Sequence, residues 1–413
     1  MISTETQSSG IASKPSFFDG LIREQVLAKL SGLKHGAFSI SEAGLLLALG
    51  DPDAEQLGVI DVGNPAFFAK TAFGGSVGAA ESYMDGDWHC DRLVDVMRLM
   101  IRNRNLLDGI EGGNARVKGW LMKTAHALRR NTQNGSRKNN SAHYDLRNPV
   151  FELFLYSSLV YSSAIFDRPG MSLEQASERK LQVICESLEL SNSDRLIEIG
   201  TGWGGMAIYA AKHYGCHVTT TTISKQQHEL ASARIQAEGL QDRITLLLSD
   251  YRELDGRFDK LVSIEMIEAI GHQFQDTYFE KCADLLAPGG KALIQAITIE
   301  DHRYRQALNS VDFIKRHIFP GSYIPCVSSM VESAARAGKL RLLHLRDIGP
   351  SYALTLNEWR RRFLANETEV LALGYDRRFF RMWDFYLAYC EAGFLEQSIS
   401  DVHLLFGKER YPS

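Results

Sequence analysis

The chain lacks the sequence features of a secreted, membrane-spanning or zinc-binding protein. Its six cysteines are scattered and form no C-x-x-C pair, so we expect reduced core residues and no metal site. Residues 1–16 are polar and show no signal peptide. The longest apolar stretch, Phe151 to Phe166, is interrupted by Glu152 and by serines and tyrosines, and is too short and too polar to span a bilayer. These absences predict a cytoplasmic protein.

The chain also lacks an excess of either charge. Its net charge of −4 and pI near 6.3 imply no bulk attraction to nucleic acid, and we expect no nucleic-acid partner. With 45% hydrophobic and 23% charged residues, the composition is that of a soluble globular protein. A length of 413 residues exceeds one ordinary domain, so two domains are expected.

One polar segment divides the chain. Residues 131–141 have neither apolar periodicity nor β-branched content, which is typical of a linker. We therefore predict an N-terminal domain over 1–125, a linker over 126–142 and a catalytic domain over 143–413. In the first domain, helical periodicity at 21–33 and 92–103 and apolar runs at 37–40, 58–62 and the glycine-rich 72–77 suggest a small mixed fold.

A basic stretch without acidic residues lies between Gly112 and Tyr144. Its lysines and arginines alternate with apolar residues, a combination that favours an anionic membrane surface. This interpretation predicts peripheral contact with the inner membrane surface. A solvated basic linker behind a domain-packing helix explains the same residues equally well.

After the linker, strands and helices alternate regularly. Apolar β runs are expected near 196–199, 217–222, 244–248, 259–265, 291–298, 342–348 and 402–406. Such alternation predicts an α/β fold with a parallel sheet and right-handed crossovers. Seven strands in this order predict a class I methyltransferase, Rossmann-like sheet.

The most informative segment is the glycine-rich turn after the first of these strands. Gly200, Gly202 and Gly204 follow an apolar run and precede a helical pattern, so a ligand can touch bare backbone there. The G-x-G-x-G spacing and the preceding Glu198 suit a ligand with an amino-acid part and an adenosine, which is S-adenosylmethionine. The alternative is a merely tight turn without a ligand.

The next two strands end in polar residues that would surround the nucleoside, because ligands of open α/β sheets bind outside the carboxyl ends of the strands. Cofactor contacts are expected from six residues: Thr222, Ile223, Ser224, Gln227, Asp250 and Tyr251. Asp250 is expected to accept a hydrogen bond from the adenine amino group, with a helix N-cap as its alternative role.

A long insertion and several aromatic residues suggest the walls of a substrate site. The segment from Glu300 to Lys339 is longer than a simple connection and carries apolar residues, as lids and substrate walls do. Tyr161, Tyr352 and the segment 383–386 offer aromatic faces for a cation, with core packing as the alternative.

Five motifs occur along the chain in the order typical of one family: HYDL at 143–146, YSSAIF at 161–166, IGTGWGG at 199–205, EMIEAIGH at 265–272 and IFPG at 318–321. The chain resembles the cyclopropane-fatty-acid synthases, and the stretch from 74 to 88 is similar to their N-terminal lipid-interacting domain. The resemblance implies transfer of a methylene from S-adenosylmethionine to a cis double bond of a phospholipid acyl chain in a bilayer, with a carbocation intermediate. It also implies a bound bicarbonate as base, and it adds Tyr161 and Ser162 to the cofactor site.

The same resemblance assigns the catalytic groups. Glu268 matches the glutamate that orients bicarbonate, whereas Glu265 stands at a variable position and is the weaker choice. The other members of the expected catalytic set are Ser163, Gln295, Ile297, Tyr352 and His272. Ser163 and Gln295 depart from a family cysteine and histidine, but both can still donate hydrogen bonds to an anion. His272 is a second acid/base group or a helix cap.

Alternatives of other classes stay open at the level of sequence. A related lipid C-methyltransferase would give methyl- or methylene-branched chains, and a small-amine N-methyltransferase would not need the N-terminal domain. A lipid-binding protein without catalysis is disfavoured by the intact glycine turn. Acyl position, headgroup preference and oligomeric state, with a homodimer as one option, are not determined by the sequence.

Overall fold

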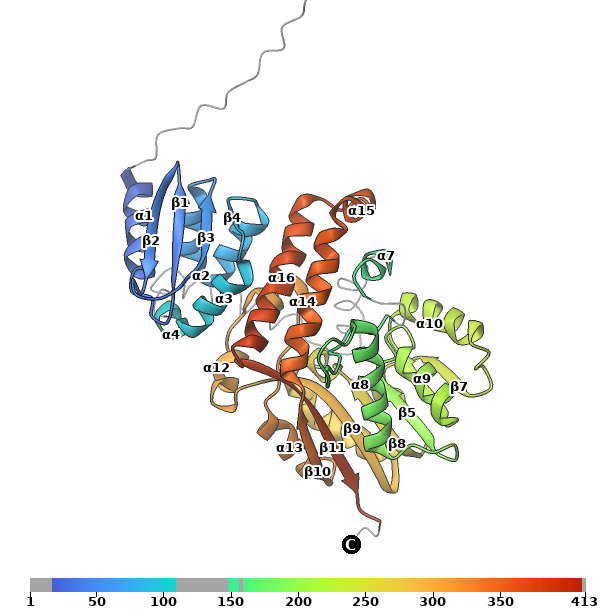
Figure 1. The fold of residues 1–413 in the computed structure, drawn as a ribbon. Coiled ribbons are helices and arrows are strands. Elements are labelled where there is room, and N and C mark those ends of the chain that lie inside the picture. The colour runs from blue at the N-terminus through green and yellow to red at the C-terminus, as the bar shows by residue number, and fades with distance from the viewer. Residues whose placement is uncertain (1–16, 109–147, 156–158, 411–413) are drawn as a thin grey trace, which may run out of the picture.

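The computed structural model describes residues 17–108, 148–155 and 159–410. The predicted linker at 126–142, the end of the first domain at 125 and the basic stretch at 112–144 lie outside the described residues. Figure 1 shows three parts side by side: an N-terminal sheet with its helices, a central pair of long helices, and a larger α/β part.

The N-terminal part is a four-stranded sheet with helices against it. Its sheet has the order β2-β1-β3-β4, with β1 parallel to β3 and antiparallel to β2. The elements are α1 (Phe17–Leu30), β1 (Ala37–Glu42), β2 (Leu45–Gly50), β3 (Gln56–Val62), α2 (Ala66–Met84), β4 (Trp88–Cys90), α3 (Leu93–Arg102) and α4 (Arg104–Asp108).

The glycine-rich stretch 72–77 lies inside α2, and it bends that helix. Gly75 has φ 56° and ψ −143°, a conformation that glycine alone adopts at low cost and that interrupts the helix. Further along, a Cβ at Gly78 would collide with the carbonyl oxygen of Lys70 across the bend. The glycines therefore allow the two halves of α2 to pack closely on each other.

The α/β part contains the predicted seven-stranded sheet, which confirms the expected fold class. Its strands are β5 (Arg195–Ile199), β6 (His217–Thr222), β7 (Ile244–Leu248), β8 (Phe258–Ile264), β9 (Leu286–Ile299), β10 (Leu340–Asp347) and β11 (Ile399–Lys408). The order is β10-β11-β9-β8-β5-β6-β7. The five strands from β5 to β9 pair in parallel, but β11 runs antiparallel to both β9 and β10. The sheet is thus mixed rather than purely parallel as expected.

Helices cover both faces of this sheet. Neighbouring strand residues pack on opposite sides: Leu196 belongs to the cluster with α8 and α9, whereas Ile197 belongs to the cluster with α11 and α13. The helices are α7 (Asn148–Glu152), α8 (Leu173–Leu188), α9 (Gly205–Tyr214), α10 (Lys225–Ala237), α11 (Gln275–Leu285), α12 (Tyr304–Leu308), α13 (Val327–Arg336), α14 (Gly349–Ala365), α15 (Glu367–Ala372) and α16 (Arg377–Leu395).

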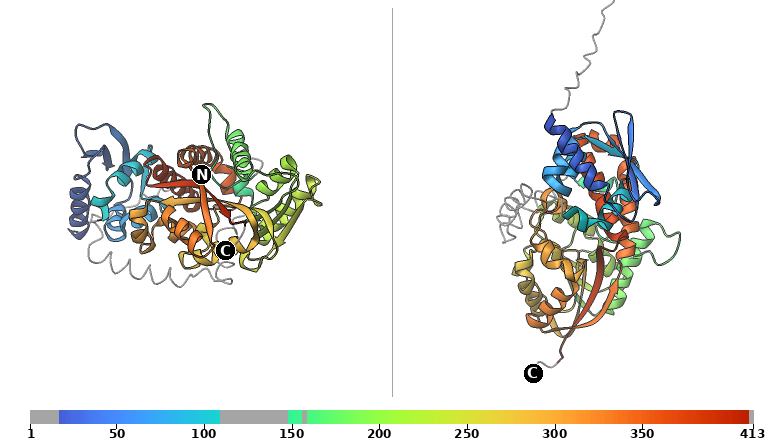
Figure 2. Two further views of the ribbon diagram at one scale, coloured as in Figure 1. Left: turned by 90° about the horizontal axis from the view of Figure 1, so that it is seen from below. Right: turned by 90° about the vertical axis from the view of Figure 1, so that its left-hand side faces the viewer.

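The long helices α14 and α16 connect β10 to β11 and join the two parts of the molecule (Figures 1 and 2). The Tyr83 hydroxyl donates a 2.5 Å hydrogen bond to Asp384 on α16. At the end of the same helix, Glu396 accepts hydrogen bonds from Arg98 and Arg102 at 2.7–2.8 Å. The N-terminal part is therefore fixed on α16 by buried and half-buried polar contacts.

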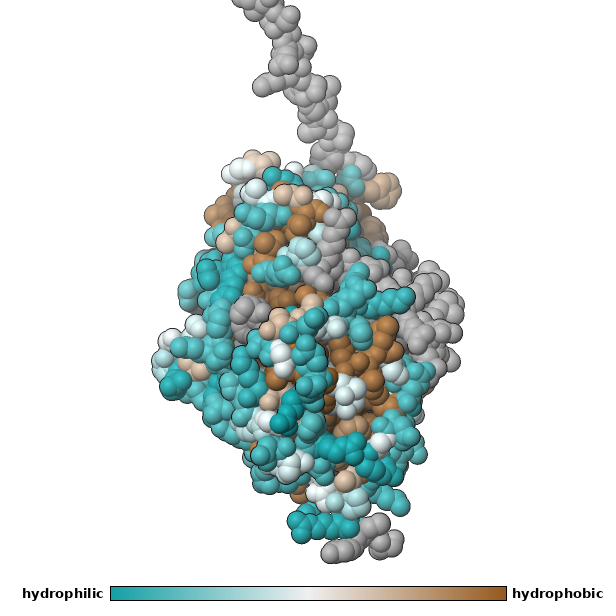
Figure 3. All heavy atoms as spheres, turned by 90° about the vertical axis from the view of Figure 1, so that its right-hand side faces the viewer, coloured by the Kyte–Doolittle hydropathy of each residue, from teal (hydrophilic) through white to brown (hydrophobic). Residues whose placement is uncertain are grey.

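No helix among the described residues is both long and apolar enough to cross a bilayer. The face in Figure 3 is mostly hydrophilic, and its apolar side chains gather in separate patches.

Candidate functional site

The glycine-rich turn lies between β5 and α9, at the carboxyl edge of the sheet. Gly200, Gly202 and Gly204 have φ of 95°, 52° and 87°, in the left-handed region that favours glycine. A Cβ at Gly202 would meet no atom within 4 Å, so its backbone borders open space that a ligand can enter. Gly204 instead starts α9, 3.4 Å from the Cβ of Ala231, and it stands outside the cavity lining. Two of the three glycines thus face the site.

Glu198 lines the same space from within β5. Its carboxylate accepts a 2.6 Å hydrogen bond from the Thr220 hydroxyl. Burial raises the pKa of Glu198 to about 7, while the Thr220 hydrogen bond and the charge of Lys180 act in the opposite direction. The group can accept hydrogen bonds from a cationic or hydroxylated ligand.

The end of β6 contributes three of the four expected residues. Thr222, Ile223 and Gln227 line the cavity, and the Thr222 hydroxyl donates to the Gln227 side-chain oxygen at 2.7 Å. The Ser224 hydroxyl instead accepts from the Gln227 backbone and caps α10, and Ser224 is absent from the lining. Ser224 thus shapes the site through the backbone of the helix it caps.

Asp250 and Tyr251 follow β7 and line the cavity, as expected. The Asp250 carboxylate also caps the short 3-10 helix Tyr251–Glu253 and binds the Arg252 guanidinium at 2.8 and 2.7 Å. The alternative role as a cap is therefore confirmed. A ligand amino group would share this carboxylate with Arg252.

Tyr161 and Ser162 reach the cavity from the segment before α8. The Tyr161 hydroxyl lies 2.9 Å from that of Tyr386, which ties this segment to α16. Ser162 accepts a 2.7 Å hydrogen bond from the ammonium of Lys180, a fully buried lysine whose pKa burial lowers to about 8. Lys180 was not singled out from the sequence, because a lysine within an amphipathic helix gives no signal of such burial.

Glu268 lies on the short 3-10 helix Ile267–Ala269, just beyond β8. One carboxyl oxygen accepts a 2.6 Å hydrogen bond from the backbone N–H of Ile297, so these two members of the expected set are in direct contact. The other oxygen is buried and has no hydrogen-bond partner within the described residues. Burial, and then the charge of Glu265, raise the pKa of Glu268 to about 8.

Glu265 occupies the centre of the expected catalytic set. Its carboxylate accepts hydrogen bonds from the Ser163 backbone at 2.8 Å, the Gln295 amide at 2.9 Å and the Tyr352 hydroxyl at 2.7 Å. Glu265, the weaker choice from the sequence, thus accepts three hydrogen bonds from this set, whereas Glu268 accepts one. The signal for Glu265 in the sequence was its location directly after a buried strand.

A second, fully buried layer holds Gln295 in place. Its amide nitrogen also donates to Asp401 at 2.8 Å, and its oxygen lies 3.1 Å from a ring nitrogen of His403. Burial lowers the pKa of His403 to about 3, so the neutral ring donates to the Gln295 oxygen. This contact orients the Gln295 side chain so that its amide nitrogen points toward Glu265 and Asp401.

The structure gives His272 no part in this site. The residue begins the 3-10 helix His272–Phe274, is exposed, and is not among the residues that line the cavity. Its catalytic assignment therefore has no support from the geometry, and its alternative role as a helix cap has none either, because Gly271 holds the N-cap position.

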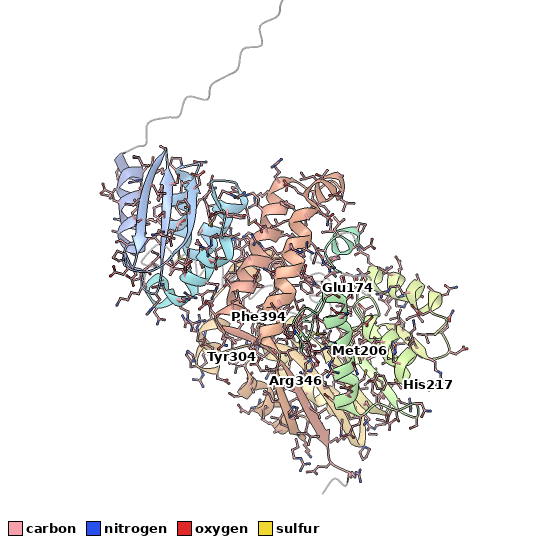
Figure 4. The ribbon with its side chains drawn as sticks, in the orientation of Figure 1. Glu174, Met206, His217, Tyr304, Arg346 and Phe394 are labelled. Carbon is pink, nitrogen blue, oxygen red and sulfur yellow. The ribbon has the colours of Figure 1, made fainter. Side chains whose placement is uncertain are left out.

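One cavity of about 1200 Å³ connects the glycine turn with the N-terminal part. The insertion after β9 forms part of its wall through Phe313, Phe319 and Tyr323, as the sequence predicted for a lid or wall. Residues of α1, α2 and α3 line its far end, among them Val26 and Ala72. In Figure 4, Met206 at the start of α9 and Phe394 near the end of α16 mark two lining positions, whereas His217 lies at the opposite end of β6.

The groups expected to hold bicarbonate are already engaged with the chain's own carboxylates. Ser163, Gln295 and Tyr352 donate to Glu265, and the Ile297 backbone donates to Glu268. As arranged, this donor set does not fit an additional bicarbonate ion. The lining around Gly202, by contrast, fits S-adenosylmethionine, since bare backbone, Glu198 and Asp250 border open space.

Comparison with known proteins points to one family. A family model described as mycolic acid cyclopropane synthetase matches residues 131–404. The cyclopropane-fatty-acyl-phospholipid synthase of Escherichia coli is 36% identical over 351 residues, which is 84% of this chain and 87% of that protein. The tuberculostearic acid methyltransferase UfaA1 of Mycobacterium tuberculosis is 35% identical over 331 residues, 78% of this chain and 76% of its own.

A solved structure supports the same conclusion. The mycolic acid cyclopropane synthase CmaA1, complexed with SAH and CTAB, superposes with a TM-score of 0.62 at 27% identity. The match covers 66% of this chain and 98% of that chain. The α/β part is thus similar to an enzyme crystallised with the product form of the methyl donor.

Proposed function

Because the chain belongs to the mycolic acid cyclopropane synthetase family, we propose that it is a cyclopropane-fatty-acyl-phospholipid synthase. It is an S-adenosylmethionine-dependent methyltransferase of lipids. The proposal adds the substrate, a cis double bond in a phospholipid acyl chain, and the product, a cyclopropane ring.

The observation that carries this proposal is the cavity that runs from the glycine turn into the N-terminal part. Apolar side chains such as Val26, Phe67 and Met97 line its N-terminal end. A pocket for a small polar substrate needs no such extension, whereas an acyl chain needs a long apolar space to leave water. The N-terminal part would then hold the chain while the α/β part holds the methyl donor.

The chemistry needs a dry site and support for a cation. S-adenosylmethionine, when bound, supplies the methyl group. An isolated alkene is a weak nucleophile. The protein must therefore hold the double bond in position and stabilise the positive charge that develops on the neighbouring carbon. Tyr161, Tyr386 and Phe394 offer aromatic faces along the cavity. A base must then accept one proton.

A branched product is the second candidate function. The similarity to the tuberculostearic acid methyltransferase nearly equals that to the cyclopropane synthase, at 35% against 36% identity. If the cation loses its proton without ring closure, the product keeps a double bond as a methylene branch. The same site and cavity serve both outcomes.

We further propose that the enzyme binds a phospholipid bilayer through the N-terminal sheet. Leu45, Leu46 and Leu47 on the edge strand β2 are 76%, 67% and 41% exposed, and Phe18 on α1, which packs beside β2, is 73% exposed. Exposed apolar groups of this kind insert at a lipid surface. Replacing Leu46 by glutamate should weaken sedimentation with phospholipid vesicles. If this edge instead forms a homodimer, the Leu46→Glu variant should become monomeric in solution while its vesicle binding stays unchanged.

The test of the function uses purified protein, vesicles of a monounsaturated phospholipid and S-adenosylmethionine. Mass spectrometry should show acyl chains that gain one CH₂ unit and lose their double bond. A gain of CH₂ with a double bond retained would favour the branched product. No change in the lipid would reject both candidates.

A further inference from the structure

We propose that Glu265 is the proton acceptor of the reaction, and that its carboxylate fills the position in which a bicarbonate ion was expected. This inference rests on the proposed function, because the proton in question is released by the alkylated acyl chain. It predicts an enzyme that works without bicarbonate.

The first support is the convergence of donors on one carboxylate. Ser163, Gln295 and Tyr352 come from three separate parts of the chain, and each donates to Glu265 within 2.9 Å. Ser163 and Gln295 are fully buried and stand behind Glu265, while Glu265 itself lines the cavity. A carboxylate therefore faces the reacting space, with Ser163 and Gln295 on its protein side and Tyr352 beside it in the cavity wall.

The second support is the backbone at Glu265. Its φ of 47° lies in the left-handed region, which residues with a side chain rarely adopt. The backbone N–H is held by the Gln295 carbonyl at 2.9 Å, so the turn after β8 keeps this conformation. Strained residues of this kind cluster at functional sites, where the surrounding contacts maintain them.

The third support is the charge of the neighbouring groups. Burial raises the pKa of Glu265, whereas the Ser163 and Tyr352 hydrogen bonds and the charge of Lys180 favour its ionised form. Burial, and then the charge of Glu265, raise the pKa of Asp401 well above its ordinary value, and Asp401 accepts a hydrogen bond from Gln295. Glu268, with its raised pKa, is neutral at pH 7. With three hydrogen-bond donors against one for Glu268, Glu265 has the surroundings that favour a carboxylate most among these groups.

The proposed step conserves atoms and charge. After methyl transfer, one former alkene carbon carries the positive charge. A C–H bond of the transferred methyl group breaks, its electron pair forms the C–C bond to that carbon and closes the ring, and the proton moves to a Glu265 oxygen. Glu265 is neutral afterwards and returns its proton to solvent when the product leaves.

The test compares product formation in degassed, bicarbonate-free buffer and with added bicarbonate. The native enzyme should have equal rates in both. In bicarbonate-free buffer, the rate of product formation by Glu265→Gly should be lower than the native rate by about 10²-fold or more, which is the effect of losing a general base. Added bicarbonate should restore much of the rate, because glycine suits a φ of 47° and leaves the three donors free. Glu265→Gln should be inactive in both buffers, since its amide fills the space, and Glu280→Gln on the exposed face of α11 should behave as native.

A binding measurement separates this inference from the proposed function. In ¹³C NMR with labelled bicarbonate, the Glu265→Gly variant should bind the ion and the native enzyme should not. Native binding, or a native rate that collapses without bicarbonate, would overturn the role of Glu265, as would a variant that binds bicarbonate and stays inactive. A native enzyme that alkylates no lipid in either buffer would instead reject the proposed function.

Discussion

Two regions of the central cavity, the cofactor end and the reaction end, are built in different ways. The cofactor end is made from short contiguous segments, each at the carboxyl end of one strand, with Gly200 and Gly202 after β5 and Asp250 after β7. The reaction end is made from single residues on distant segments, which meet only around Glu265. Binding the methyl donor and moving the proton should therefore respond to different substitutions.

The largest expected effect is at the cofactor end. Gly202→Val should weaken S-adenosylmethionine binding by about 10²-fold or more, because a side chain would fill the open space beside the backbone and resist a φ of 52°. Calorimetry measures this. Gly239→Val is the matched control, since Gly239 also has a positive φ of 67° and an open Cβ position but lies away from the cavity. Equal losses in both variants would mean that strain alone is responsible.

The N-terminal end of the cavity offers the next test. Ala72→Trp should reduce kcat/KM for phospholipid by about 10²-fold, because the indole would displace the acyl chain, while S-adenosylmethionine affinity stays native. Ala69→Trp, on the same helix but outside the lining, is the control. If both variants turn over lipid at the native rate, the acyl chain does not use this end of the cavity.

The same difference between contiguous segments and distant residues decides which features of the protein could be predicted from the sequence. The seven strands and the glycine turn were predictable, because each depends on a local run of residues. The strand β2 was missed, although Leu45 to Gly50 is apolar, because its exposed leucines do not alternate with polar residues. The three donors to Glu265 were not predicted as its partners, because they are 30 to 102 residues away in the chain. Such convergence is a property of tertiary packing, which no local pattern records.

A pH profile distinguishes the two glutamates at the reaction end. With a pKa of about 8, Glu268 is neutral at pH 7 and ionises as the pH rises. The ionised Glu268 carboxylate would face Glu265, Asp401 and Tyr323, and its second oxygen would have no hydrogen-bond donor among the described residues. Turnover should therefore fall above pH 8, by up to about tenfold per pH unit. Glu268→Gln should keep most of the activity at pH 7 and lose this fall; an unchanged profile would assign the titration to another group.

The smallest effect is expected at the contact between the two parts of the molecule. Glu396→Gln should destabilise the fold by about 1 kcal/mol, since its partners Arg98 and Arg102 are half-exposed and screened by salt. The Arg102 hydrogen bond lowers the pKa of Glu396 below its usual value. The stabilisation that Glu396 provides is therefore fully present above the pKa that Glu396 has in the unfolded protein. It is lost as the pH falls through the lower pKa that Glu396 has in the folded protein. Thermal unfolding at pH 7 and pH 3 should show the difference between native and variant shrinking at pH 3.

The most direct test of the central claim, that the transferred methyl group loses a proton within this cavity, follows that group with deuterium. The enzyme receives S-adenosylmethionine with a fully deuterated methyl group and monounsaturated phospholipid vesicles, and the product is analysed by mass spectrometry. The account predicts a saturated acyl product that retains two of the three deuterons. A product with all three deuterons would show that the methyl group is transferred intact, and would contradict it.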